Sequence, residues 1–480
     1  MTTASELVAA ARRAYAHDMH TRAQLDECAR RLDEPLRVAL AGSLKAGKST
    51  LLNALVGQAV APTDATECTR VVTWYRNGPT PNVTAVEGDR RFPVRLQRND
   101  TGLTFDLGDG AADRLDRLEV QWPASTLAVN TVIDTPGTSS LSRQVSARTS
   151  ALLTPEGSAS GADAVVYLLR SLSDSDVGFL RQIGSHIGAE SGPLGVVGVV
   201  SRADEIGAGR IDAMMSARDI AARFAGELER TGLCQAVVPV AGLLAFAART
   251  LREYEFRAFE ALAAVPVEQL QLALLSADRF ARVELPVEAG VRAELARRFG
   301  LFGIRMAVTM VRLGVRDSPT LAAELVTRSG LDELRTVLDV QFGQRAEQLK
   351  THSALVSLDR VLRAAPPNTA AAQLLPDVGR LLADVHGFAE LRLLGRLRTT
   401  GIGLPDNDIA ELTRLIGGSG VAPHRRLGVA PDADLAGAAM AAVRKWRARA
   451  QHPLLDQFTA RACAVAARSA EGVLELSRQS

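Results

Sequence analysis

The chain has 480 residues, enough for two to four domains, and its 47% hydrophobic and 23% charged residues are typical of a globular protein. The formal net charge of +2 gives no electrostatic indication of a nucleic-acid partner. Four cysteines stand far apart without a C-x-x-C pair, which argues against a disulfide framework or a zinc site and favours a reducing compartment.

The N-terminal region is predicted to form one long helix over residues 3–33, because apolar residues recur at helical spacing until Pro35. Charged residues occur throughout it, so it does not resemble a signal peptide. We find no stretch of the ~20 apolar residues that cross a bilayer. We therefore expect a cytoplasmic protein whose membrane contact is peripheral, at the inner face of the cell membrane.

From Leu36 onward, short apolar runs alternate with helical stretches, a pattern typical of a mainly parallel sheet covered on both faces. Segment 80–121 is expected to add antiparallel strands at the edge of that sheet. The runs predicted as strands are 36–42, 70–76, 130–137, 162–170, 195–204 and 236–242.

After about residue 243 the strand pattern stops and helical periodicity continues almost to the C-terminus. The most regular stretch predicts a helix over 330–363, with Ser329 as its N-cap and Asp332 three residues later. At ~1.5 Å per residue this helix would be roughly 50 Å long. Gly343 in its interior weakens the prediction that it is unbroken. A helical domain without an activity of its own is the alternative for this region.

Residues 42–49 read GSLKAGKS and fit the pattern G-x-x-x-x-G-K-[ST] of a phosphate-binding loop. In such loops, backbone N–H groups surround the phosphates, the lysine reaches the β- and γ-phosphate oxygens, and the serine hydroxyl binds Mg²⁺. A strand is predicted before the loop and a helix after it, as this function requires. We predict nucleotide contacts from Gly42, Ser43, Lys45, Ala46, Gly47, Lys48, Ser49 and Thr50.

Two later motifs indicate that the nucleotide carries guanine. IDTPG places Asp134 at the end of a strand, where a carboxylate supports Mg²⁺, and Gly137 where its N–H can sense the γ-phosphate. SRAD ends another strand, and Asp204 can accept hydrogen bonds from guanine N1–H and N2–H₂, which adenine cannot supply. An ordinary helix N-cap is the alternative for SRAD. A guanine-side loop is expected near Ala241 and Gly242.

A threonine between the loop and Asp134 is needed to complete Mg²⁺ coordination and to position the attacking water. We choose Thr69, because it directly precedes the predicted strand RVVTW, and the alternative is an ordinary loop threonine. The four threonines with suitable hydroxyls are Thr63, Thr66, Thr69 and Thr73.

Together these motifs resemble the dynamin-like large GTPases of bacterial type, and more narrowly an isoniazid-inducible actinobacterial group within that family. The likeness rests on LKAGKSTLLNALVG, APTDATECTRVVTW, IDTPGTSSL, ADAVVYLLRSLSDSD, SRADEIGAGRIDAM and RFGLFGIRMA, and extends over most of the chain. It implies an α/β phosphate-loop GTPase domain over 35–345 with a helical insertion around 245–325. It also implies an elongated helical neck or stalk over 346–480, on which residues 1–34 pack.

The resemblance implies roles for individual residues as well. Lys48, Thr69 and Lys45 become the expected catalytic residues. Ser49 and Thr69 are expected to bind Mg²⁺, and Asp134 is expected to support the ion without binding it directly. Arg202 replaces the usual lysine of the guanine motif, and its methylene stem can still cover the base.

Lys45 stands where eukaryotic dynamins have a catalytic serine. Its cation would neutralise charge that develops between the β- and γ-phosphates. The alternatives are a surface side chain or a contact to an opposite head. No glutamine follows Gly137, so we expect slow basal hydrolysis that accelerates when heads pair.

Two functions remain open at this point. The first is a mechanoenzyme in which Mg²⁺-dependent hydrolysis of GTP to GDP drives self-association of heads and remodels an anionic membrane. The second is a GTP-gated subunit of a larger dynamin-like paralogue, which the short segment after the head favours. An assembly GTPase acting on RNA is disfavoured by the near-neutral charge. The alternative for the candidate membrane contacts is that the apolar ones pack inside the helical bundle and the arginines face water. The candidates are Leu374, Leu375, Ile402, Leu404, Arg425 and Arg426.

Overall fold

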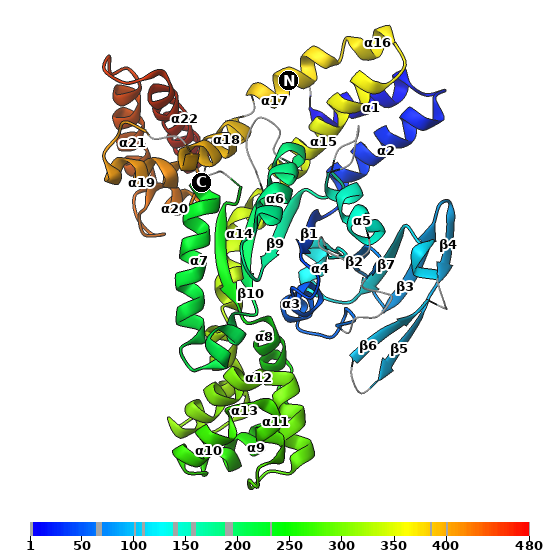
Figure 1. The fold of residues 1–480 in the computed structure, drawn as a ribbon. Coiled ribbons are helices and arrows are strands. Elements are labelled where there is room, and N and C mark those ends of the chain that lie inside the picture. The colour runs from blue at the N-terminus through cyan, green and yellow to red at the C-terminus, as the bar shows by residue number, and fades with distance from the viewer. Residues whose placement is uncertain are drawn as a thin grey trace.

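The strands of the molecule lie mainly in one large sheet (Figure 1). The computed structural model describes residues 3–63, 70–99, 102–107, 111–137, 143–154, 160–187, 195–230, 233–384, 386–399 and 402–479. The strands within these residues are β1 (Leu36–Gly42), β2 (Thr73–Asn77), β3 (Asn82–Glu87), β4 (Arg90–Pro93), β5 (Arg95–Asn99), β6 (Gly102–Asp106), β7 (Arg117–Trp122), β8 (Asn130–Asp134), β9 (Ala164–Leu169), β10 (Val196–Ser201) and β11 (Ala236–Val240).

The large sheet has the strand order β11-β10-β9-β1-β8-β2-β7-β3-β4 among the described residues. Pairing is parallel from β11 to β8 and between β2 and β7, whereas β2 runs antiparallel to β8. β3 and β4 extend the sheet with antiparallel pairs, and β5 and β6 form a separate hairpin. Each of the six predicted runs contains a strand, and the predicted antiparallel edge is present. The predicted α/β phosphate-loop fold is confirmed.

Helices cover both faces of this sheet and form the rest of the molecule. They are α1 (Ala4–Ala14), α2 (Met19–Asp33), α3 (Lys48–Val56), α4 (Ser125–Val129), α5 (Arg143–Leu153), α6 (Asp174–Ile187), α7 (Ala213–Arg230), α8 (Gly242–Arg249), α9 (Glu253–Ala263), α10 (Val267–Ala273), α11 (Ala277–Arg282), α12 (Ala289–Arg312), α13 (Ser318–Arg328), α14 (Leu331–Gln341), α15 (Ala346–Ala364), α16 (Thr369–Ala372), α17 (Leu375–Asp384), α18 (His386–Thr399), α19 (Asp406–Leu415), α20 (Pro423–Leu427), α21 (Leu435–Ala450) and α22 (Gln457–Gln479). None of the described helices is both long and apolar enough to span a membrane.

The central strands are buried on both faces of the sheet. Successive side chains of a strand point to opposite faces, so each strand contributes residues to the apolar cores on both sides. On one face, Val38 belongs to the same apolar core as Leu52 of α3. On the other face, Val165 shares a core with Leu180 of α6 and Phe224 of α7. Burial on both sides explains why these strands read as continuous apolar runs rather than as alternating ones.

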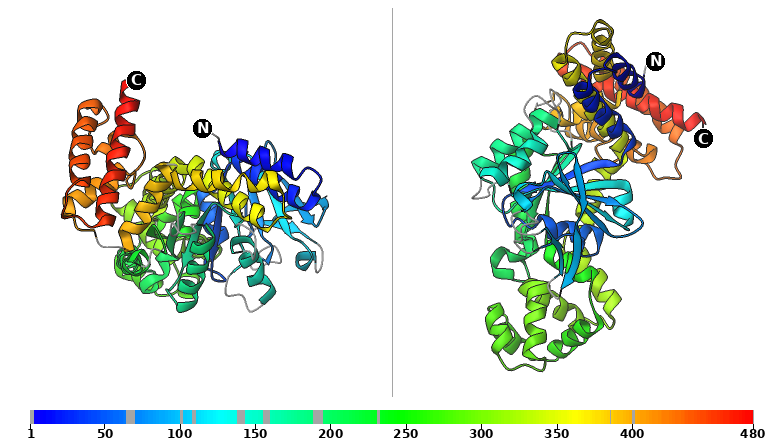
Figure 2. Two further views of the ribbon diagram at one scale, coloured as in Figure 1. Left: turned by 90° about the horizontal axis from the view of Figure 1, so that it is seen from above. Right: turned by 90° about the vertical axis from the view of Figure 1, so that its right-hand side faces the viewer.

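The N-terminal region forms two helices instead of the single helix predicted from its periodicity. The Asp18 side chain accepts hydrogen bonds from the backbone N–H groups of His20 and Thr21, so it caps α2 and separates it from α1. Both helices pack against α15, as the two views in Figures 1 and 2 show. Tyr15 also bonds to the carbonyl of Pro366 beyond α15, at 2.9 Å.

The predicted helix over 330–363 is also divided, so the expected length of roughly 50 Å is wrong. Ser329 is the C-cap of α13, not the N-cap of the helix that follows it. Gly330 precedes α14 with a φ of 79°, and a Cβ there would lie 2.3 Å from the Pro239 carbonyl oxygen. The division of the predicted helix follows Phe342, where a short 3-10 helix (Gly343–Arg345) leads into α15. It falls at Gly343, the residue that weakened the prediction of an unbroken helix.

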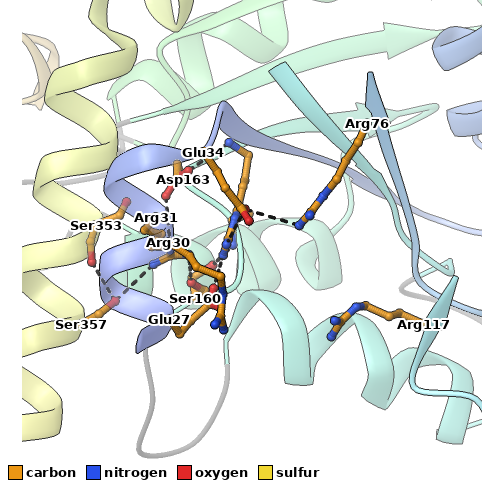
Figure 3. Close-up of polar contacts among 12 residues, drawn as sticks. Glu27, Arg30, Arg31, Glu34, Arg76, Arg117, Ser160, Asp163, Ser353 and Ser357 are labelled. Carbon is orange, nitrogen blue, oxygen red and sulfur yellow. Dashed lines mark hydrogen bonds and ion pairs between the residues drawn. The ribbon is translucent and has the colours of Figure 1, made fainter. Parts of the chain in front are cut away.

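A polar network joins α2 to the sheet and to α15 (Figure 3). The buried Arg31 guanidinium forms an ion pair with Asp163 at 3.4 Å and donates a hydrogen bond to Ser357 of α15 at 3.2 Å. Asp163 in turn accepts the backbone N–H of Arg37 in β1 at 2.9 Å. Lys350 of α15 donates to the Leu32 and Glu34 carbonyls at the end of α2, which satisfies its last turn.

The other helices form two groups, each with its own apolar core. Helices α8 to α13 and the start of α7 make a helical lobe at the foot of the view in Figure 1. Helices α18 to α22 make a C-terminal cluster around Trp446. Among the described residues of these two groups, those that line the nucleotide-binding candidates described next belong to the lobe.

Candidate nucleotide-binding site

The loop predicted to bind phosphate lies between β1 and α3, at the carboxyl end of the parallel strands. Gly42 has a φ of 141°, and a Cβ there would lie 2.4 Å from the Leu168 carbonyl oxygen of β9. Gly47 has a φ of 95° and begins α3. The two glycines therefore allow a close turn whose N–H groups lead into the N-terminus of a helix.

Backbone carbonyl groups of this loop hold the Lys48 side chain. Its side chain is buried, and Nζ donates hydrogen bonds to the carbonyl oxygens of Gly42 and Ser43, both at 3.2 Å. Burial lowers the pKa of Lys48, and the nearby Asp134 carboxylate acts in the opposite direction. An anionic phosphate in front of the loop would stabilise the ammonium form in the same way as Asp134 does.

Ser49 and Asp134 meet at the end of β8 with chemistry suited to a divalent cation. Ser49 Oγ donates to Asp134 Oδ2 at 2.6 Å, while Asp134 Oδ1 is buried without a hydrogen-bond partner among the described residues. Burial raises the pKa of Asp134, and Lys48 and the Ser49 bond oppose that rise. A hydroxyl and a carboxylate with a spare oxygen are hard oxygen ligands of the kind that Mg²⁺ prefers, so these residues fit the predicted metal.

A cavity of about 310 Å³ opens in front of these groups, large enough for the phosphates of a nucleotide. Two of the four candidate threonines, Thr63 and Thr73, line it. Thr66 and Thr69, the latter our predicted water-positioning residue, lie outside the described residues. The cavity is lined by Leu44, Lys45, Ala46, Gly47, Lys48, Ser49, Thr50, Pro62, Thr63, Val71, Thr73, Tyr75, Asp134, Thr135, Gly137 and Arg202.

A second cavity of about 120 Å³ adjoins the first and holds Asp204. The Asp204 carboxyl group is buried, which raises its pKa to about 6. Gly242 and Leu243, which follow β11, form part of the same wall, so the predicted guanine-side loop near Ala241 and Gly242 lies beside Asp204. A purine enclosed here would meet the buried Asp204 carboxylate, an acceptor that matches the N1–H and N2–H₂ donors of guanine.

Arg202 connects the two cavities, which sequence reasoning did not anticipate. It lines both of them, and its Nε donates a hydrogen bond to the Lys45 carbonyl oxygen at 3.1 Å. Another of its nitrogens bonds to Glu205 at 2.6 Å. Arg202 and Lys45 have φ angles of 52° and 59°, in a region that residues with a Cβ seldom occupy. No sequence pattern we used predicts such a bond, because it depends on the left-handed backbone at both ends.

Several known proteins resemble this chain in sequence. Residues 38–200 match the model of the dynamin family. The chain is 54% identical over 456 residues to the isoniazid-induced protein IniC of two Mycobacterium tuberculosis strains, covering 94% of this chain and 92% of that protein. It is also 26% identical over 163 residues to a bacterial dynamin-like protein of Nostoc punctiforme, covering 32% of this chain and 22% of that protein.

Solved structures of an oligomerised bacterial dynamin pair that senses and tethers membranes align with this chain at 13% identity and a TM-score of 0.33, too low to carry an argument. One alignment covers 82% of this chain and the other 99%, and each covers 73% of the solved chain. The family is established by the identity to IniC over almost the whole chain. The chain belongs to the dynamin family of GTP-hydrolysing enzymes.

Proposed function

We propose that this chain binds GTP with Mg²⁺ in the two adjoining cavities and couples its hydrolysis to association of heads and remodelling of the cytoplasmic membrane. The observation that carries the nucleotide part is the bond between Ser49 and Asp134, with a free carboxylate oxygen beside the buried Lys48. The coupling to membrane is supported by membership of the dynamin family.

The proposed roles follow from where each group lies. Asp204 accepts hydrogen bonds from the guanine edge, and the turn between Gly42 and Gly47 directs N–H groups at the phosphates. The Lys48 ammonium reaches the β- and γ-phosphate oxygens once nucleotide displaces it from the loop carbonyls. Ser49 and Asp134 would hold Mg²⁺, which supplies positive charge where the β- and γ-phosphates separate. Thr69 remains our choice for positioning the attacking water.

We further propose that residues 35–345 act as the head and that 346–480, together with 1–34, act as the neck. Two observations support this division. Helices α1 and α2 pack on α15, which follows directly from the end of the proposed head. The Arg31 network then links that helical layer to β1, the strand that leads into the phosphate loop.

A second candidate function is a GTP-gated partner of a larger dynamin-like paralogue, without membrane-deforming activity of its own. It is favoured because most of the predicted membrane contacts are occupied. Leu374 and Leu375 pack on the central core, and Ile402 and Leu404 pack on the C-terminal cluster. Arg426 bonds to Glu390 at 3.0 Å.

One predicted basic residue and one further apolar residue of the C-terminal cluster are exposed and could meet a membrane surface. Arg425 is exposed, and Leu454 in the turn between α21 and α22 has 87% of its surface exposed. Arg425 would meet anionic headgroups, and Leu454 would enter the lipid interface. These two residues give the mechanoenzyme hypothesis two exposed positions to test.

The test combines phosphate release with sedimentation on anionic liposomes. We expect phosphate release from GTP with Mg²⁺ and almost none with EDTA, and the Ser49→Ala variant should be as inactive as the EDTA sample. Binding and tubulation of liposomes by this chain alone, weakened by Leu454→Ser, support the mechanoenzyme. Hydrolysis without liposome binding favours the partner subunit. Hydrolysis that is unchanged by EDTA would overturn the proposed Mg²⁺ site.

A further inference from the structure

The segment that carries Asp204 has backbone conformations that its own residue types do not favour. Within residues 202–210, Arg202, Gly207, Ala208 and Gly209 have φ angles of 52°, 62°, 59° and 68°. Left-handed conformations at Arg202 and Ala208 are unfavourable for residues with a Cβ, so they persist only where neighbouring structure holds them. The position of the Asp204 carboxylate therefore depends on what packs against this segment.

Helix α12 of the helical lobe packs against it directly. Gly300 interrupts this helix with φ 64° and ψ 173°, and a Cβ there would lie 3.6 Å from Asp204 Oδ2. A Cβ on Gly209 would lie 3.3 Å from the backbone nitrogen of Phe302. Arg305, one turn further along α12, donates hydrogen bonds to the carbonyl oxygens of Gly209 and Leu274, both at 2.5 Å. The kink thus brings α12 against the Asp204 segment, and Arg305 fixes the end of that segment.

The same helix also packs against α8. Gly303 lies against Leu244 of α8, where a Cβ on Gly303 would be 2.9 Å from Leu244 Cδ1. Helix α8 begins at Gly242, which lines the Asp204 cavity. One turn of α12 therefore contacts both the segment that carries Asp204 and the helix that begins at the cavity.

We propose that α12 sets the guanine selectivity of the site, with Gly300 and Arg305 as positioning residues that act through Asp204. Gly300 permits the backbone kink that brings α12 beside the carboxylate, and Arg305 holds the left-handed turn at Gly209. Neither residue touches the nucleotide. The proposal rests on the proposed role of Asp204 as the acceptor for guanine.

The test compares affinities for GDP and inosine diphosphate, which lacks only the exocyclic amine of guanine, by displacement of a fluorescent GDP analogue. Wild-type protein should prefer GDP by about tenfold or more, because a hydrogen bond to a charged group is lost with the amine. Gly300→Ala forces a Cβ into a conformation that is almost exclusive to glycine, and Arg305→Gln removes the tie to Gly209. Both variants should reduce the preference to about threefold or less.

Two matched variants in α12 serve as controls. Gly290→Ala adds a Cβ where no atom lies within 4 Å. Arg312→Gln removes bonds to the carbonyls of Ala263 and Val265, inside the lobe and away from Asp204. Both should keep the wild-type preference, as should Ser49→Ala, which weakens phosphate-side binding of either nucleotide alike.

The outcomes separate this inference from the proposed function. An unchanged preference in folded Gly300→Ala and Arg305→Gln would overturn the inference, and Arg305→Gln decides alone if Gly300→Ala does not fold. A reduced preference in Arg312→Gln would also overturn it, because general loosening of the lobe would then suffice. If wild type itself does not prefer GDP, or if Asp204→Asn leaves the preference unchanged, the role of Asp204 fails before any lobe variant is considered.

Discussion

At the scale of single residues, the buried Asp204 carboxyl group makes nucleotide binding sensitive to pH. Burial raises its pKa from the ordinary 3.8 to about 6, so the group becomes protonated well above the usual range. Only the ionised carboxylate can accept both guanine donors. We therefore expect the affinity for GDP to fall about tenfold for each pH unit below about 6, measured by isothermal titration or by fluorescence.

The stability of the nucleotide-free protein should change in the opposite direction. Between pH 3.8 and about 6 the folded protein holds a proton on Asp204 that the unfolded chain has lost. The Asp204 contribution to the free energy of unfolding therefore decreases as pH rises through this window. Asp204→Asn removes the titrating group, so a GDP affinity that keeps its acid sensitivity in this variant would contradict the assignment.

Lys45 is the second residue whose proposed role can be separated from general binding. Its exposed side chain lines the larger cavity, while its backbone carbonyl is held by Arg202. If its cation stabilises charge that develops during hydrolysis, Lys45→Ala should lower the turnover number at least about tenfold and change GTP affinity much less. Single-turnover kinetics and equilibrium binding give the two quantities.

Lys45→Arg provides the control, since it keeps the charge on the same left-handed backbone. It should retain more turnover than Lys45→Ala. Equal losses of turnover and affinity in the alanine variant would instead indicate an ordinary binding contact.

At the scale of helices and strands, the Arg31 network makes α2 part of the sheet's structure. Arg31 and Asp163 have side-chain exposures of 4% and 1%, so replacing Arg31 leaves a buried carboxylate unpaired. Asp163 keeps its hydrogen bond from the Arg37 N–H, so we expect Arg31→Ala to lower the free energy of unfolding by about 3 kcal/mol, measured by denaturant titration.

Arg30, the residue before Arg31 in the same helix, is the matched control. Its pair with Glu27 is 55% exposed on the arginine side, so Arg30→Ala should cost less than about 1 kcal/mol. Similar losses in both variants would show that the buried pair has no special importance.

The same scale shows how far sequence reasoning could go. The strands and the phosphate loop were predictable because their signals are local: continuous apolar runs, and glycines and a lysine at fixed spacing. The division after Ala14 was not, since apolar periodicity continues across it, and the division after Phe342 was indicated by Gly343 alone. Long-range contacts such as that between Arg305 and Gly209 also leave no local trace in the sequence.

At the scale of the whole molecule, the site should depend on a second head for full activity. No glutamine follows Gly137 to orient the attacking water, and the cavity beside Lys45 opens to solvent. We predict that GTP turnover per molecule rises with protein concentration, because pairing of heads would help to orient the attacking water. Steady-state phosphate release over a wide concentration range tests this.

Sedimentation velocity with a transition-state mimic of GTP gives the independent check. It should show association under the conditions in which turnover is highest. Turnover per molecule that stays constant while the chain remains a monomer would contradict the proposed pairing of heads.

The scarcity of lysine has a practical consequence. Of the four lysines, Lys48 and Lys350 are buried and donate hydrogen bonds to carbonyl oxygens. The Lys445 ammonium pairs with the carboxylates of Asp408 at 2.7 Å and Glu411 at 2.6 Å. Lys45 is the exposed one among them. An acylating reagent applied to the intact protein would therefore label the mouth of the nucleotide cavity before the other lysine side chains. The tag found on Lys45 by peptide mapping then becomes a footprint of occupancy, without any engineered probe.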